Sequence, residues 1–140
     1  MTRDEILILL TRRQEALKSR NATAFGSVYA RNAELHSPLV GSVAGRDAIE
    51  RASEAFWSAF PDAVITEEAP IVDRDRVAIV AEVTGTHAGE IMGLPPSGRA
   101  FRFPVVFLLV VDDREIVAER RIYDFTGLLV QIGVLKAKPA

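Results

Sequence analysis

The spacing of apolar residues changes near Pro61, and this change constrains the fold more than any other feature of the 140-residue chain. Before Phe60, apolar residues recur at intervals of three and four, which is typical of amphipathic helices. After Pro61 they alternate with a period of two, which is typical of strands with one buried face. Helices followed by strands predict an α+β fold. The length and the lack of internal repeats favour one domain over residues 1–140.

Three helices are expected in the first half. Thr2 and Glu5 have the spacing of a capping box, which predicts a helix to about Arg20. Asn21 can cap a second, shorter helix that continues through Tyr29. A third helix is expected from Arg46 to the proline at position 61. Between the second and third helices, we expect a short strand over residues 34–38 and a loop over residues 41–45.

The second half predicts a sheet. Strands are expected over residues 64–72, 77–87, 101–111 and 116–124. The strand over 101–111 is apolar on both faces, which predicts a central strand covered on both sides. Residues 89–98 are rich in proline and glycine and form a long connection, and Gly133 is expected to close a short C-terminal helix.

Composition excludes several classes of function. The net charge is −2, from 17 basic and 19 acidic residues mixed along the chain, so the basic surface of a nucleic-acid binder is missing. No apolar run is long enough to cross a membrane. The chain has no cysteine, which excludes thiol nucleophiles and thiolate metal sites and favours a cytoplasmic location.

The strand over residues 116–124 carries the first candidate site. Strict alternation would place Ile116, Ala118, Arg120, Ile122 and Asp124 on one face. Charged side chains on an otherwise apolar face must be paired, neutralised or used. We therefore interpret this face as the wall of a pocket, and the alternative is an ordinary structural ion pair or a strand end in water.

Three segments together resemble the SnoaL-like polyketide cyclase (ester cyclase) family. They are Phe60-Pro61-Asp62, the Gly-Thr-His to Pro-Pro-Ser-Gly block over residues 85–98, and Asp124 followed by residues 127–135. The resemblance implies a nuclear-transport-factor-2-like cone, in which a curved antiparallel or mixed sheet wraps around N-terminal helices. It also implies a homodimer formed through the sheet, and ring closure of a polyketide ester by intramolecular aldol condensation without a metal or an organic cofactor.

The resemblance also suggests which residues act. Asp124 matches the family's acid/base aspartate, and His36 matches a histidine at the cavity mouth that could donate to an enolate. Many members carry a tryptophan where this chain has Arg120. An inward arginine would make the pocket cationic, would lower the pKa of Asp124 if the two met, and would suit a carboxylated ligand.

Five further residues are candidate substrate contacts. Trp57 and Tyr29 could supply aromatic surface, although helical spacing also fits a place in the core. His87 could contact a ligand or hold the long connection, and Met92 could face a ligand from that connection. Arg102 could face the pocket across the last hairpin, depending on strand register. The histidine spacing does not support a metal site, so none is expected.

The sequence leaves three functions open. The first is a small lyase or isomerase that acts on an apolar carbonyl compound, with Asp124 as catalytic acid/base residue and His36 or Arg120 as the catalytic residue that stabilises the oxyanion. The second is an epoxide hydrolase, although a second inward aspartate is missing from the expected strands. The third is a non-catalytic module that binds a small molecule. A closed pair between Arg120 and Asp124 would favour binding or a purely structural role.

Overall fold

The computed structural model describes residues 1–136. In chain order, the elements are α1 (Arg3–Ser19), α2 (Ala22–Gly26), β1 (Tyr29–Ser37), β2 (Gly41–Ala44), α3 (Arg46–Ala59), β3 (Val64–Glu67), β4 (Ile71–Asp73), β5 (Arg76–Thr86), β6 (Ala100–Asp112), β7 (Glu115–Tyr123) and α4 (Phe125–Gln131).

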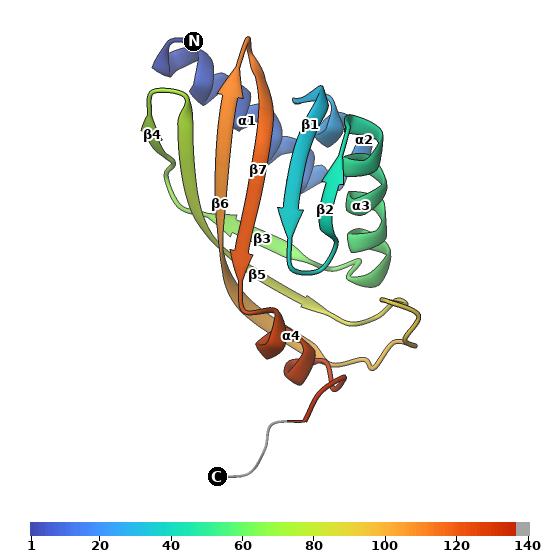
Figure 1. Cartoon of the computed structure of the whole chain (residues 1–140). Helices are drawn as coiled ribbons and strands as arrows, with labels where there is room; N and C mark the ends of the chain where they lie inside the picture. The colour runs from blue at the N-terminus through green and yellow to red at the C-terminus, as the bar shows by residue number, and fades with distance from the viewer. Residues whose placement is uncertain (137–140) are drawn as a thin grey trace.

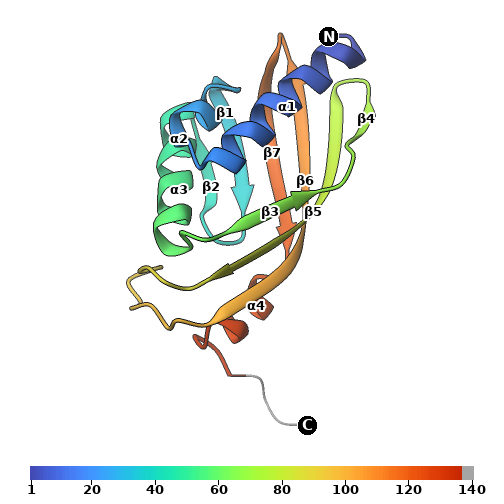
Figure 2. The same cartoon turned by 180° about the vertical axis from the view of Figure 1, so that it is seen from behind.

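The strands form one mixed, curved sheet in the order β2-β1-β7-β6-β5-β3, and β4 pairs with β5. The pairing of β1 with β7 is parallel, and the other pairs are antiparallel. Helices α1, α2 and α3 lie on one side of the sheet (Figure 2), whereas on the side facing the viewer in Figure 1 the short helix α4 lies at the lower end of β6 and the upper parts of β6 and β7 are open. This arrangement confirms the predicted α+β cone.

Local signals in the sequence explain both ends of α1. The Thr2 side chain accepts a hydrogen bond from the backbone nitrogen of Glu5, and Arg20 ends the helix in the left-handed conformation. The second helix is shorter than expected. Asn21 caps it by accepting from the Ala24 nitrogen, but the helix ends at Gly26, and Tyr29 already belongs to β1.

Two further boundaries differ from the prediction. Residues 41–45 are not a loop, because Gly41–Ala44 pairs with the end of β1. The expected strand over 64–72 is two strands, and both pair with β5. Pro70 lies between them and has no backbone N–H to donate to a ladder, which accounts for the interruption.

A β-bulge in β7 reverses the faces that alternation predicted. Val110 pairs with Ala118 whereas Val111 pairs with Ile116, so Val117 is an extra residue on one side of the ladder. Ile116 is buried on the inner face. Beyond the bulge, the inward side chains are those of Glu119, Arg121 and Tyr123, whereas Arg120 is exposed. The prediction that Arg120 and Asp124 line an inner wall is therefore wrong.

The inner face of β6 supplies much of the core. Phe101, Phe103, Val105 and Phe107 alternate along it and are buried. The opposite face is only half-buried at Val106, Leu108 and Val110, contrary to the prediction of full cover for residues 101–111. There, Val106 pairs with exposed Val80 on one side and exposed Ile122 on the other.

The short C-terminal helix matches expectation. The short helix α4 is followed by Gly133 at φ 86°, a conformation that glycine adopts without strain. Among residues 1–136, no helix is both long and apolar enough to cross a membrane.

Candidate active site

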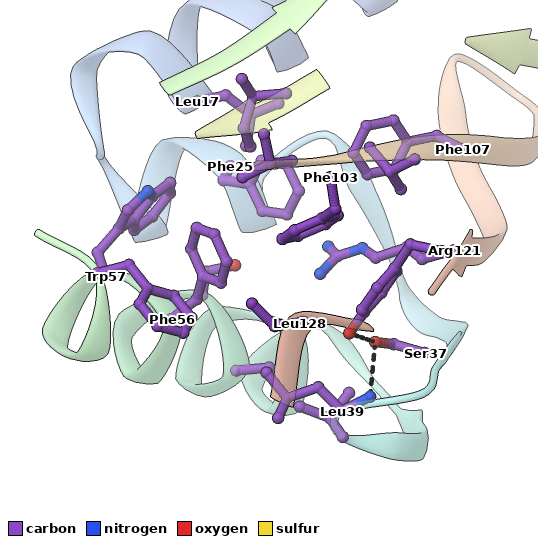
Figure 3. Close-up of a pocket in the computed structure, with 18 of the residues that line it drawn as sticks. Leu17, Phe25, Ser37, Leu39, Phe56, Trp57, Phe103, Phe107, Arg121 and Leu128 are labelled. Atoms are coloured by element: carbon purple, nitrogen blue, oxygen red, sulfur yellow. Dashed lines mark hydrogen bonds between the residues drawn. The ribbon is translucent and has the colours of Figure 1, made fainter. Parts of the chain in front are cut away.

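A narrow cavity lies between the helices and the concave face of the sheet. Its volume is about 60 Å³, room for only a few water molecules. Aromatic side chains make up much of its wall, and six of them are Phe25, Phe56, Trp57, Phe60, Phe103 and Phe107. Figure 3 shows Phe56 and Trp57 on α3 facing the strand residues across this space.

The polar lining is confined to five side chains: Arg13, Ser37, Ser53, Arg121 and Tyr123. Figure 3 shows Arg121 reaching from β7 toward Phe103 and the interior of the cavity. None of the described lining residues is an aspartate, a glutamate or a histidine. The cavity therefore offers hydrogen-bond donors but no side chain that readily accepts a proton near neutral pH.

A buried ionic network stands behind this polar lining. Glu119 is buried, and its Oε1 accepts from Arg13 Nη2 at 3.1 Å and from Arg13 Nε at 3.3 Å. The hydroxyl of Tyr29 donates to the same oxygen. The other oxygen, Oε2, accepts from Arg121 Nε at 2.7 Å. Glu119 thus joins α1, β1 and β7 in one network.

The network keeps Glu119 ionised. Burial alone would raise its pKa, but the charges of Arg13 and Arg121 and the hydrogen bond from Tyr29 outweigh burial and lower the pKa to about 2. Burial and the neighbouring Glu119 raise the pKa of the Tyr29 hydroxyl, which therefore stays protonated. A carboxylate with such a low pKa is a poor general base at neutral pH.

Glu67 is a second carboxyl group near the same arginine. Its Oε2 lies 3.7 Å from Arg13 Nη1, which is too long for a hydrogen bond. Glu67 Oε1 and Arg13 Nη1 are both buried and have no hydrogen-bond partner among the described residues. Burial raises the pKa of Glu67, and the charge of Arg13 only partly opposes this shift.

Arg121 is the charged group best placed to meet a ligand. Its Nε bonds to Glu119, whereas its terminal nitrogens have no acceptor among residues 1–136. The guanidinium lies 5.9 Å from the ring centroid of Phe107, and 20% of the side-chain surface is exposed to solvent. Nearby, the hydroxyls of Ser37 and Tyr123 lie 3.3 Å apart.

The three residues predicted as catalytic do not meet in this cavity. Arg120 is on the outer face, and Asp124 caps α4 by accepting from the Gly127 nitrogen at 2.8 Å. Asp124 is exposed, and no ion pair joins it to Arg120 among the described residues. His36 is also exposed and forms a 2.7 Å hydrogen bond with Ser42 on β2.

Three of the predicted substrate contacts also lie elsewhere. Arg102 is on the outer face, where it forms a 3.3 Å ion pair with Glu82. Met92 is exposed in the connection between β5 and β6. His87 is buried, and its Nδ1 accepts from the Ser97 nitrogen at 3.1 Å, so it joins the two ends of that connection.

The two aromatic candidates lie in or next to the cavity. Trp57 lines it directly, half-buried, with its ring 6.4 Å from that of Phe25 in an edge-on arrangement. Tyr29 is fully buried behind the wall and bonds to Glu119. Its position makes it part of the ionic network rather than of the cavity lining.

Three key residues were missed, and the sequence contains a clear signal only for the first. Arg13 falls on the apolar stripe of α1, four residues after Leu9 and four before Leu17, a spacing that points an arginine into the core. Glu119 and Arg121 share a face in any regular strand, but the strand's first residues suggested that this face was the outer one. Only the bulge at Val117 reverses that assignment.

No group of three or more histidine, aspartate or glutamate side chains within residues 1–136 is placed to hold a metal ion. The donor-rich cavity described above is therefore the best-supported candidate site.

A family model for SnoaL-like polyketide cyclases matches residues 8–132. AclR, a candidate hydroxylase from Streptomyces galilaeus, is 25% identical, with 99% of this chain and 87% of AclR covered and a TM-score of 0.83. IdmH, a candidate polyketide cyclase from Streptomyces antibioticus, is 26% identical, with coverages of 89% and 96% and a TM-score of 0.74.

A candidate SnoaL-like polyketide cyclase from Jannaschia sp. CCS1 shares the fold at 20% identity, with coverages of 97% and 94% and a TM-score of 0.82. No protein with a curated description matches the chain.

Proposed function

The chain belongs to the SnoaL-like polyketide cyclase family, and we propose that it is a cofactor-independent enzyme of cyclase or isomerase type. Its proposed substrate is an apolar carbonyl compound that binds in the aromatic cavity, and because the volume of this cavity is only about 60 Å³, the lining side chains must move apart to admit it. The proposed reaction removes a proton next to a carbonyl group and closes a ring, or moves a double bond, through an enolate.

The observation that carries this proposal is that Arg121 and Tyr123, two residues apart on β7, both line a largely apolar cavity. An enolate places negative charge on the former carbonyl oxygen, and fixed donors in a poorly solvated site stabilise such charge strongly. Glu119 holds the Arg121 side chain through Nε, so the terminal nitrogens are already oriented when a ligand arrives. The proposed role of both residues is to stabilise this oxyanion.

Asp124 stays our proposed acid/base residue, on the strength of the family resemblance. It directly follows Tyr123 at the end of β7, but its carboxylate is engaged in capping α4 and does not line the cavity. Proton transfer by Asp124 therefore requires its carboxylate to leave the cap of α4 and turn toward the cavity.

A second candidate function is binding without catalysis. It is favoured by the lack of a carboxylate or histidine among the described lining residues, because ligand binding needs no general base. Epoxide hydrolysis is less favoured, since Glu119, the nearest carboxylate to Arg121, is bound by two arginines and has a pKa of about 2.

The test is a thermal-shift screen with aromatic polyketide methyl esters, ketosteroids, epoxides and small carboxylic acids, followed by product analysis of every hit. Wild type is compared with Arg121→Gln and Asp124→Asn. Arg120→Gln is the matched control, because it removes the same charge from the neighbouring position on the opposite face.

Turnover that falls in Arg121→Gln but not in Arg120→Gln would support the proposed oxyanion role. Turnover that is lost in Asp124→Asn while binding persists would support Asp124 as the base. Binding without any product in wild type would move the assignment to the non-catalytic module.

We further propose that the protein forms a homodimer through its open sheet face, and that it acts in the cytoplasm. Val80, Val106 and Ile122 form an apolar row across three adjacent strands, and 38% of Val80 and 45% of Ile122 are exposed. A two-fold interface uses the same patch on both subunits, so an apolar row of this kind can pair with itself. A second copy of the chain would remove it from water.

A further inference from the structure

The polar end of the cavity has hydrogen-bond donors that the protein does not satisfy. A guanidinium carries five N–H groups, and only the Nε group of Arg121 has an acceptor among residues 1–136. Figure 3 shows the Arg121 side chain extending into the cavity, which the side chains of Ser37 and Tyr123 also line. A ligand that satisfies this end must therefore bring acceptor oxygens.

No described carboxylate competes for those donors inside the cavity. Glu119 is the nearest, but its Oε1 already accepts from Arg13 and Tyr29, and its Oε2 accepts from Arg121 Nε. Glu67 pairs with Arg13 rather than with Arg121. The terminal nitrogens of Arg121 are thus left for a group from outside the protein.

The surroundings make a charged acceptor more favourable than a neutral one. Phe107 lies beside the Arg121 guanidinium, and Phe103 stacks on Tyr123 with ring centroids 5.0 Å apart. Apolar walls screen charge less than water does, so a hydrogen bond between two charged groups gains strength there. The planar fork of a guanidinium also matches the two oxygens of a carboxylate.

We propose that the cavity, widened by movement of its lining side chains, selects small aromatic compounds that carry an ionised carboxylate, in preference to their esters or amides. The carboxylate binds the terminal nitrogens of Arg121, and the ring packs against Phe103 and Phe107. The Tyr123 hydroxyl, together with the terminal N–H groups of Arg121 that the carboxylate leaves free, then donates to a carbonyl next to the carboxylate. This inference rests on the proposed use of the cavity as the ligand site, and it names the substrate class: an aromatic acid rather than a methyl ester.

The test uses 2-naphthoate, methyl 2-naphthoate and 2-naphthamide. The three probes share one ring system, and only 2-naphthoate carries a charge at pH 7. Isothermal titration calorimetry at pH 7 measures the affinity of each probe for wild type, Arg121→Met and Arg120→Met. The Arg120 variant is the matched control for loss of a positive charge on the same strand. Circular dichroism confirms that each variant is folded.

Wild type is expected to bind the acid at least about 10-fold more tightly than the ester or the amide, as one charge-assisted hydrogen bond would give. Arg121→Met should remove this preference and leave ester binding within about 2-fold. Arg120→Met should change neither. Should Arg121→Met fail to fold, Arg121→Lys keeps the charge without the two-pronged geometry and should weaken acid binding only.

Equal affinity for acid and ester in wild type would overturn the proposal, as would an acid preference that survives in both Arg121 variants, or no binding of any probe at millimolar concentration. The outcome is separable from that of the proposed reaction. Turnover of an ester without acid preference would reject only the substrate class, whereas acid-selective binding with no turnover in the full screen would reject only the enzyme.

Discussion

Arg13 and Glu119 are 106 positions apart in the chain and form a buried ion pair, with Arg13 Nη2 3.1 Å from Glu119 Oε1. The pair joins α1 to the strand that carries Arg121. Arg13 also lies over the ring of Phe107, 4.5 Å from its centroid. The same carboxylate therefore ties the helix layer to the sheet and orients the residue that we propose to contact the ligand.

Breaking this pair on one side should be strongly destabilising. Glu119→Gln and Arg13→Met are each expected to lower the free energy of unfolding by about 3–5 kcal/mol, because each leaves a buried charge without its partner. The double variant should cost less than the sum of the two single variants. Urea unfolding of all four proteins measures the coupling.

Glu115→Gln serves as the control for that series. Glu115 pairs with Arg46 at 3.0 Å, but both side chains are more than 30% exposed, so the loss should stay below about 1 kcal/mol. Additive effects of the Arg13 and Glu119 substitutions would show that the two groups do not stabilise each other.

Acid should destabilise the protein through Glu119. Its pKa is lowered from 4.5 to about 2 on folding, so its contribution to stability is complete above pH 4.5 and is lost as the pH falls toward 2. The expected loss is about 3 kcal/mol over this window. Urea unfolding at several pH values between 2 and 6 measures it.

Glu67 acts in the opposite direction, because its pKa is raised on folding. Protonation of Glu67 is favoured in the folded state, so its contribution is largest at low pH and falls as the pH rises through its folded pKa. In Glu67→Gln, the free energy of unfolding should therefore fall more steeply as the pH is lowered than in wild type. In Glu119→Gln, it should fall less steeply. A slope that is unchanged in Glu119→Gln would assign the acid sensitivity to another group.

Asp124 has a structural role that can be separated from catalysis. Asparagine caps helices about as well as aspartate, whereas alanine does not. Asp124→Asn should change the free energy of unfolding by only a few tenths of a kcal/mol, and Asp124→Ala should lower it by about 1 kcal/mol. Thermal or urea unfolding gives both values, and equal stability of the two variants would argue against the cap.

The open sheet face predicts a dimer that one substitution can weaken. Val106→Glu places a charge in the centre of the apolar row and should shift the protein toward monomer in analytical ultracentrifugation. Ile8→Glu is the control, because Ile8 is 64% exposed on α1, away from the sheet face. A wild-type monomer at all concentrations would contradict the proposed interface.

Sequence alone determined the three N-terminal helices and the change to a sheet after Pro61, although it missed β2 and the break between β3 and β4. The spacing of apolar residues changes from about 3.6 to two near Pro61, because side chains project differently from helices and strands. This spacing is a local property, so it can be recognised without knowledge of tertiary contacts. Caps at Thr2 and Asn21 and the closing Gly133 follow from the same local chemistry. Trp57, expected from the sequence to supply aromatic surface, lies in the wall of the cavity because of its position on α3, and its contact with a ligand stays a prediction.

Tertiary structure alone decided which charges face inward. One extra residue at Val117 reverses the faces of β7, so that Glu119 and Arg121 take the inner positions and Arg120 the outer one. A bulge is set by pairing with β6 and leaves no clear mark in the residues of one strand. Likewise, the pairing of Arg13 with Glu119 depends on a contact between segments that only the complete fold brings together.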